Sequence, residues 1–189
     1  DFENVPAESA HWLSDRIPVF PNPNALAVSQ DRLAEKNLFR ELGIGVPDFH
    51  DIASADDLHA AIGIIGMPCI LKTRRLGYDG KGQYRIKSAA DIDAAWRSLG
   101  AQALTVGLIL EAWVPFEREI SVIAVRARDG EFRHWALTEN WHENGVLSAS
   151  LSPATETSAF ENTAVTYARK VAAHMGVPLH VVGIGNAIV

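Results

Sequence analysis

The pattern of apolar and polar positions in the centre of the chain predicts two amphipathic helices and several short strands. Leu58, Ile62 and Ile65 recur at helical spacing after a capping-box pattern at 54–57. A second capping pattern predicts a helix within 88–100. Together with the strands, these helices make a small, mostly antiparallel α+β unit. Its predicted strands lie at 68–72 and 83–87, and a further strand with a buried pattern is predicted after the unit, at 108–114.

The flanks predict further elements of both kinds. Residues 17–23 are apolar and rich in proline, which indicates a strand running into an extended connection. Ser29 is expected to cap a helix through Arg40, with Gly43 as its terminator. Later elements complete an α+β fold: a hairpin of strands at 119–126 and 132–137 with its turn at Asp129 and Gly130, and a long helix at 156–175.

Composition narrows the functional classes. The 189 residues are 48% hydrophobic and carry a formal net charge of −6, with scattered basic residues that argue against a nucleic-acid surface. No apolar run approaches the roughly 20 residues of a membrane-crossing helix. The single Cys69 lies in an apolar segment, which predicts a buried thiol and fits a reducing cytoplasm. Neither the histidine spacing nor this cysteine suggests zinc, so no metal ligand is predicted.

A basic, glycine-rich loop is the strongest chemical signal. It follows an apolar strand that ends near Lys72, and it contains Arg74, Arg75 and Lys81 among three glycines. Glycines let backbone N–H groups approach phosphate oxygens, while the basic side chains supply compensating charge. The spacing is not that of a Walker loop. The competing interpretation is a hairpin with a turn at Asp79–Gly80 and solvated basic side chains.

Four features then follow in order along the chain: Arg32 on a helix, Lys72 before the loop, the strand end at 111–114, and Glu119. Taken alone, Arg32 and Lys36 would be two solvated charges on one helical face, and Glu111 could equally make a structural salt bridge. Their order resembles the ATP-grasp superfamily. That resemblance implies two α+β lobes with ATP between them, with Lys72 on the phosphates, Glu111 on the adenine and Glu119 on the ribose.

Within this superfamily the chain resembles the 5-(carboxyamino)imidazole ribonucleotide synthases of purine biosynthesis. The resemblance rests on the loop at 72–83, the opening at 1–6, and the segments at 30–33, 114–119 and 138–145. It implies carboxylation of aminoimidazole ribonucleotide by bicarbonate, with ATP and Mg²⁺ and with carboxyphosphate as the activated species. It also implies a cytoplasmic homodimer.

The resemblance further implies a set of site residues. Tyr78, Asp79 and Lys81 would contact the ribonucleotide and the carboxylating intermediate, and His142 would belong to the nucleotide site. The other nucleotide-binding positions implied are Gly77, Gly80, Gly82, Gln83, Ala112, Trp113 and Val114. The domains expected are a remnant of an N-terminal nucleotide-fold domain at 1–30, a small lobe at 31–112 and a large lobe at 113–189.

The chain departs from the family pattern at both ends. The resemblance leads us to expect that most of the family's N-terminal domain is missing from this sequence, and residues 180–189 contain no carboxylate where the family's magnesium ligands are expected. Truncation, a frameshifted tail or missing segments would each explain this departure. We therefore expect an incomplete chain with weak catalysis or none. The alternatives are another ATP-grasp carboxylating or formylating ligase, a nucleotide-binding fragment without turnover, and, least favoured, a structural interaction module.

Overall fold

The computed structural model describes residues 5–77, 82–143, 146–175 and 182–185. Contacts divide the chain into two compact units. We call residues 30–41 and 45–115 the small-sheet unit, and residues 1–29, 42–44 and 116–189 the large-sheet unit. Each unit is described by itself.

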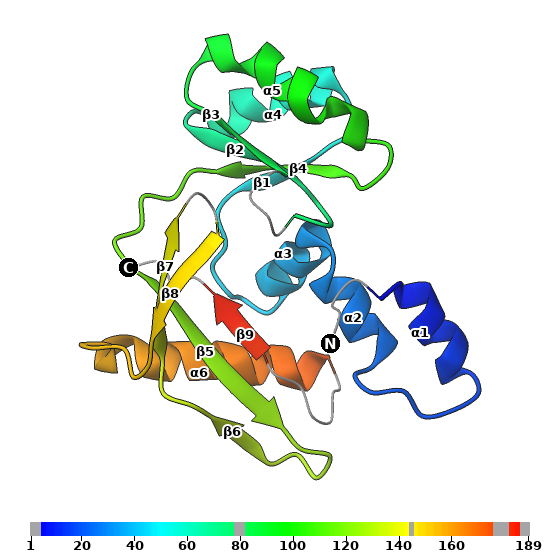
Figure 1. Cartoon of the computed structure of the whole chain (residues 1–189), viewed down its shortest axis with the longest axis vertical. Helices are drawn as coiled ribbons and strands as arrows, with labels where there is room; N and C mark the ends of the chain where they lie inside the picture. Colours follow the sequence, from blue (N-terminus) through cyan, green and yellow to red (C-terminus); the bar gives the residue numbers. More distant parts are fainter. Residues whose placement is uncertain (1–4, 78–81, 144–145, 176–181, 186–189) are drawn as a thin grey trace. The chain divides into compact units, whose positions relative to one another are not determined.

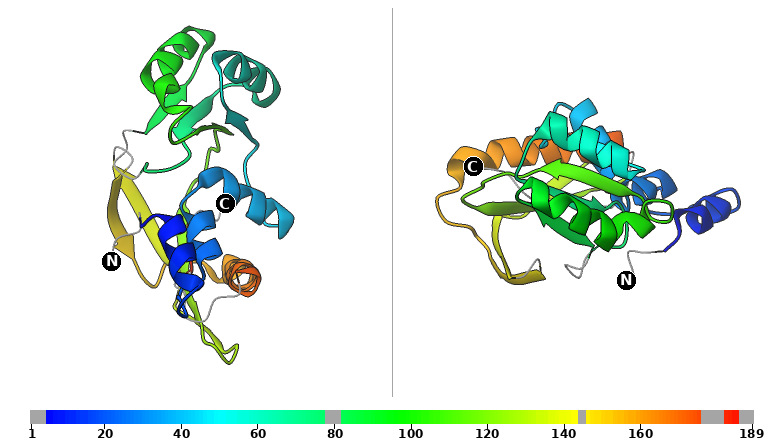
Figure 2. Two further views of the ribbon diagram at one scale, coloured as in Figure 1. Left: turned by 90° about the vertical axis from the view of Figure 1, so that its right-hand side faces the viewer. Right: turned by 90° about the horizontal axis from the view of Figure 1, so that it is seen from above.

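The small-sheet unit holds a four-stranded antiparallel sheet in the order β1-β4-β2-β3. Helices α4 and α5 cover one face of it (Figures 1 and 2), and Leu58, Leu71, Leu99 and Leu110 meet in the core between them. The elements are α3 (Arg32–Glu41), β1 (Phe49–Ile52), α4 (Ala55–Ile65), β2 (Cys69–Thr73), β3 (Gln83–Ile86), α5 (Ile92–Leu99) and β4 (Leu108–Ala112), with 3₁₀ turns at Ala89–Asp91 and Gly100–Gln102.

The large-sheet unit is built on a second antiparallel sheet in the order β6-β5-β7-β8, with β9 paired to β5. Helix α6 runs beside β5 and β9 (Figure 1), and Ile120, Val122, Ala164 and Ala168 pack in the core of this unit. The elements are α1 (Ala7–Ser14), α2 (Pro23–Ser29), β5 (Glu119–Arg126), β6 (Phe132–His134), β7 (Thr138–Glu143), β8 (Val146–Leu151), α6 (Ser158–His174) and β9 (Val182–Gly185).

The predicted α+β fold with antiparallel sheets is confirmed, and so are most of its central elements. Helix α4 begins where the capping pattern places it, because the Ser54 hydroxyl accepts a hydrogen bond from the Asp57 N–H at 3.1 Å. It ends at Gly66, whose φ of +82° favours glycine. Cys69 is buried as expected.

Two sequence predictions on the N-terminal side are wrong. Residues 17–23 form no strand, because Pro18, Pro21 and Pro23 have no N–H to offer a sheet, and Pro23 instead begins α2. The single helix expected from Ser29 is two helices. Ser29 ends α2, and the side chain of Asp31 caps α3 by accepting the N–H of Leu33 at 3.0 Å.

Several elements carried no sequence prediction, namely α1, β1, the β7–β8 hairpin and β9. The second strand of the predicted hairpin, β6, is shorter than expected and stops at His134. Within the described ranges, no helix is both long and apolar enough to span a membrane.

Candidate functional site

Lys72 and Glu111 lie on the same face of the small sheet. Side chains alternate along a strand, so when Leu71 and Leu110 face the core under α4 and α5, the residues next to them face the other way. Lys72 is paired with Ile109, and Ile70 with Glu111. Lys72 and Glu111 are therefore diagonal neighbours on that outer face, at a distance that long side chains bridge.

Glu111 is an ionised carboxylate held at the end of an apolar strand. The residue is only 5% exposed, and its Oε2 contacts Lys72 Nζ at 2.8 Å and Lys36 Nζ at 3.4 Å. Burial opposes ionisation, but the two ammonium groups outweigh it and hold the pKa of Glu111 below its usual value. Its Oε1 is buried without a hydrogen-bond partner in the described part of the chain.

The interpretation of Arg32 and Lys36 as solvated charges is wrong. The Lys36 side chain is 15% exposed and faces Glu111. The Arg32 guanidinium donates to the carbonyl oxygen of Thr73 at 3.0 Å and to that of Gly77 at 2.7 Å. Arg32 and Lys36 therefore both contact the strands and the loop that carry the candidate site.

The two ends of the glycine loop meet at Thr73. The Thr73 N–H donates to the Gly82 carbonyl at 2.8 Å, and Thr73 Oγ1 is buried without a hydrogen-bond partner in the described ranges. A Cβ added at Gly82 would lie 2.6 Å from this hydroxyl, and one at Gly77 would lie 2.9 Å from it. A larger residue at either position would therefore force a neighbouring side chain or the loop to move. Gln83 begins β3 and lies opposite Lys72.

The central part of the predicted loop, Tyr78, Asp79, Gly80 and Lys81, lies outside the described residues. The two arginines that precede this part of the loop, Arg74 and Arg75, both form ion pairs with Asp31. Arg74 makes a two-pronged contact with Asp31, Nε to Oδ1 at 3.0 Å and Nη2 to Oδ2 at 2.6 Å. Arg75 contacts the same carboxylate at 3.3 Å. The alternative interpretation of the loop, with solvated basic side chains, is therefore wrong for Arg74 and Arg75.

The end of β4 is fixed by backbone bonds and by an aromatic contact. The Ala112 N–H donates to the backbone carbonyl of Asp48 at 2.8 Å, and the Trp113 N–H donates to the Pro68 carbonyl at 3.2 Å. The Arg85 guanidinium lies 3.6 Å from the centre of the Trp113 ring, a cation–π contact. Ala112, Trp113 and Val114 are all half-buried.

In the large-sheet unit, Glu119 and His142 meet. Glu119 on β5 lies opposite Asn140 on β7, so His142, two residues further on, is its diagonal neighbour. His142 Nδ1 lies 3.0 Å from Glu119 Oε2. The structure thus brings together two residues that lie 23 positions apart in the sequence.

Two further groups of contacts were not predicted. Arg118 makes a two-pronged ion pair with Glu139, at 2.9 and 2.6 Å, and donates to the Thr155 carbonyl at 2.8 Å. The Asp31 cluster was also missed. An acidic residue just before a helix is the signal that indicates it, whereas the sequence pattern predicts the cap at Ser29.

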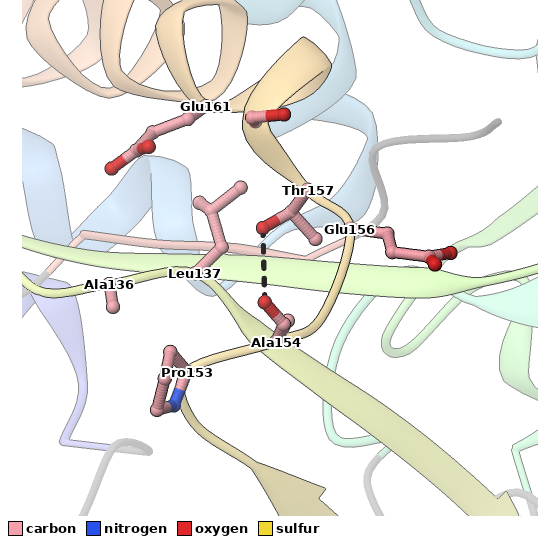
Figure 3. A pocket seen from close by; sticks show the side chains of 8 residues that line it. Ala136, Leu137, Pro153, Ala154, Glu156, Thr157 and Glu161 are labelled. Atoms are coloured by element: carbon pink, nitrogen blue, oxygen red, sulfur yellow. Dashed lines mark hydrogen bonds between the residues drawn. The ribbon is translucent and has the colours of Figure 1, made fainter.

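A pocket of about 310 Å³ also lies in the large-sheet unit, at the start of α6 (Figure 3). None of the predicted site residues lines it. Carboxylates of Glu156 and Glu161 border it, and these have the wrong charge for a phosphate. Among the described residues, no three His, Cys, Asp or Glu side chains are grouped to hold a metal ion.

A small antiparallel sheet whose lysine leads into a glycine loop, with a buried glutamate on the neighbouring strand, is the arrangement of an ATP-grasp protein. Residues 37–185 match the ATP-grasp domain, and the chain belongs to that family. Residues 1–30 match the ribonucleotide synthetase preATP-grasp domain.

Its relatives are N5-carboxyaminoimidazole ribonucleotide synthases, which confirms the resemblance. The Pseudomonas aeruginosa synthase is 49% identical over 152 residues, which are 80% of this chain and 41% of that protein. The Thermus thermophilus synthetase structure is 40% identical with a TM-score of 0.84, over 94% of this chain and 47% of that one. N5-carboxyaminoimidazole synthetase from Staphylococcus aureus, complexed with ADP, is 28% identical with a TM-score of 0.82, over 92% and 45% of the respective chains. The chain spans less than half of each.

Proposed function

We propose that this chain is the ATP-binding part of an ATP-dependent carbon–nitrogen ligase. The reaction joins bicarbonate to the exocyclic amine of aminoimidazole ribonucleotide and gives N5-carboxyaminoimidazole ribonucleotide, ADP and phosphate. The names of the relatives support the reaction, and the bound ADP of the Staphylococcus aureus synthetase supports the nucleotide. The small-sheet and large-sheet units would be the two lobes of the ATP-grasp fold.

The observation that carries the proposal is the buried carboxylate of Glu111, with one oxygen on two lysines and the other without a described partner. Leaving a buried acceptor unpaired costs about 1–3 kcal/mol, so a donor that reaches it is favoured. The exocyclic amine of adenine is such a donor. Lys72 can leave Glu111 for a phosphate oxygen, because an ammonium group on a flexible stem exchanges partners easily.

The remaining site residues fit this assignment by their chemistry. Glu119 can accept hydrogen bonds from two vicinal ribose hydroxyls, and His142 at 3.0 Å orients its carboxylate. Arg32 donates to the carbonyl oxygens of Thr73 and Gly77, and a guanidinium group carries further N–H donors suited to a phosphate. Tyr78, Asp79 and Lys81 stay proposed contacts of the ribonucleotide. Gly77, Gly80, Gly82, Gln83, Ala112, Trp113 and Val114 stay proposed nucleotide contacts.

Magnesium is expected with ATP in this family, but the described residues offer no group of ligands for it, so no step is assigned to it. Bicarbonate and aminoimidazole ribonucleotide are proposed substrates. A homodimer in the cytoplasm stays a prediction.

The test is ADP release by the chain incubated with ATP, Mg²⁺, bicarbonate and aminoimidazole ribonucleotide. The proposal expects slow release that requires both bicarbonate and this ribonucleotide and that is lost in Lys72→Ala. Release with a different amine acceptor, but not with aminoimidazole ribonucleotide, would identify another ligase of the same fold. ATP binding without ADP release under any of these conditions would indicate a nucleotide-binding fragment. The chain spans less than half of the relatives described above, which is consistent with that outcome.

A further inference from the structure

We propose that Asp31 is a positioning residue. It fixes the first residues of the glycine loop, 73–77, to the first turn of α3 and so orients Lys72. The inference deepens the proposed function and rests on it, because the position of Lys72 matters only if this loop holds a nucleotide. Asp31 itself acts through Arg74 and the loop backbone.

The Asp31 carboxylate joins the helix to the loop. Asp31 is 2% exposed, and its Oδ1 accepts from the Leu33 N–H at 3.0 Å and from Arg74 Nε at 3.0 Å. Its Oδ2 accepts from Arg74 Nη2 at 2.6 Å. One side chain therefore caps α3 and receives both prongs of the arginine that follows Thr73.

Backbone hydrogen bonds also join the start of α3 to the start of the glycine loop. The Arg32 N–H donates to the Arg74 carbonyl at 3.0 Å, and the Arg74 N–H donates to the Gly107 carbonyl at 2.9 Å. The Arg32 guanidinium holds the carbonyls of Thr73 and Gly77. The stretch from Thr73 to Gly77 is thus attached to α3 at several points, directly after Lys72.

Stability alone is a weak explanation for this cluster. A buried ion pair often contributes no more to stability than an apolar pair of the same volume, because removing both charges from water is costly. A two-pronged arginine–carboxylate contact does, however, fix relative orientation. A lysine that binds a phosphate must be held in a fixed orientation, since small displacements of a binding group cost affinity.

The test compares Asp31→Asn with Asp51→Asn in the whole chain. Asparagine is as good a helix cap as aspartate, so Asp31→Asn keeps the cap of α3 and removes the charge that pairs with Arg74. Asp51 is the matched control: its Oδ1 contacts the same guanidinium at 3.2 Å, but its side chain is 53% exposed. Arg74→Lys, which keeps the charge and loses the fork, is the second test variant.

Two readouts are taken, ATP affinity by calorimetry and amide hydrogen exchange by NMR. For Asp31→Asn we expect the ATP dissociation constant to rise roughly tenfold, about 1.4 kcal/mol, with faster exchange at the amides of Arg32, Thr73 and Arg74. Arg74→Lys should show a smaller change of the same kind, and Asp51→Asn less than about a twofold change.

Wild-type affinity in a folded Asp31→Asn variant would overturn the proposal. So would lost affinity with faster exchange throughout the small-sheet unit, because that pattern means general destabilisation. If Asp31→Asn does not fold, the decision passes to Arg74→Lys, and unchanged affinity there overturns the proposal. If the wild-type chain binds no ATP, the proposed function fails and this inference fails with it, whereas wild-type binding with insensitive variants refutes the inference alone.

Discussion

Glu111 shows how a single residue gets its chemistry from neighbours that are distant in sequence. Lys36 and Lys72 approach it from α3 and β2, 75 and 39 positions away. The sequence could indicate that a carboxylate at the end of an apolar strand needs a partner, and that Lys72 precedes a glycine loop. It could not identify Lys36, because an exposed and a paired lysine on a helical face have the same local pattern.

The raised pKa of Glu35, a single residue of α3, predicts that the stability of the chain depends on pH. Burial raises the pKa of Glu35 above its usual value, partly offset by Lys36 and Arg32. An acid whose pKa is raised on folding favours the unfolded state once that state ionises. Stability therefore falls as the pH rises through the usual value of 4.5 towards the folded pKa.

Glu35→Gln should remove this loss. We expect its free energy of unfolding to exceed that of the wild type at pH 7, and the difference to disappear below about pH 4. Urea denaturation at both pH values measures this. Glu41→Gln, at an exposed position of the same helix, should change stability by less than about 0.5 kcal/mol. A Glu35→Gln variant that is no more stable at pH 7 would contradict the account.

Elements were predictable where local signals agree with the final packing. Helix α4 has its cap at Ser54, its apolar stripe and its terminal glycine within one continuous segment, and all three are confirmed. The break between α2 and α3 was missed because Ser29 and Asp31, two positions apart, are equally good helix caps, and only Asp31 caps α3. The β7–β8 hairpin was missed because β8 is exposed along its whole length and has no buried face to create an alternating pattern.

The close approach of Gly82 to Thr73, where β2 meets the loop, predicts that a larger residue at position 82 is destabilising. Gly82→Ala would place a methyl group 2.6 Å from Thr73 Oγ1, so the buried Thr73 side chain or the adjoining backbone must shift. We expect a loss of about 1–3 kcal/mol of unfolding free energy, together with weaker ATP binding.

Gly63 provides the matched control for this substitution. It lies inside α4, and an added Cβ meets no atom within 4 Å. Gly63→Ala should therefore stabilise the chain by about 0.5–1 kcal/mol and leave ATP affinity unchanged. Equal effects of the two substitutions in chemical denaturation would show that the crowding at Thr73 is not a constraint.

At the scale of the whole molecule, two sheets with separate hydrophobic cores carry the two groups of candidate residues. Lys72 and Glu111 belong to the small-sheet unit, and Glu119 and His142 to the large-sheet unit. The order of these residues along the chain sufficed to predict the fold family. Pairings such as β9 with β5 join segments about 60 residues apart and have no local signal.

The central claim is that Lys72 and Glu111 form part of an ATP site. Calorimetric titration of the chain with ATP tests it most directly, with Lys72→Ala as the test variant and Lys87→Ala, at an exposed lysine just after β3, as the control. The account predicts that the wild type and Lys87→Ala bind ATP alike, and that Lys72→Ala weakens binding at least about tenfold. Equal ATP affinity in a folded Lys72→Ala variant would contradict it.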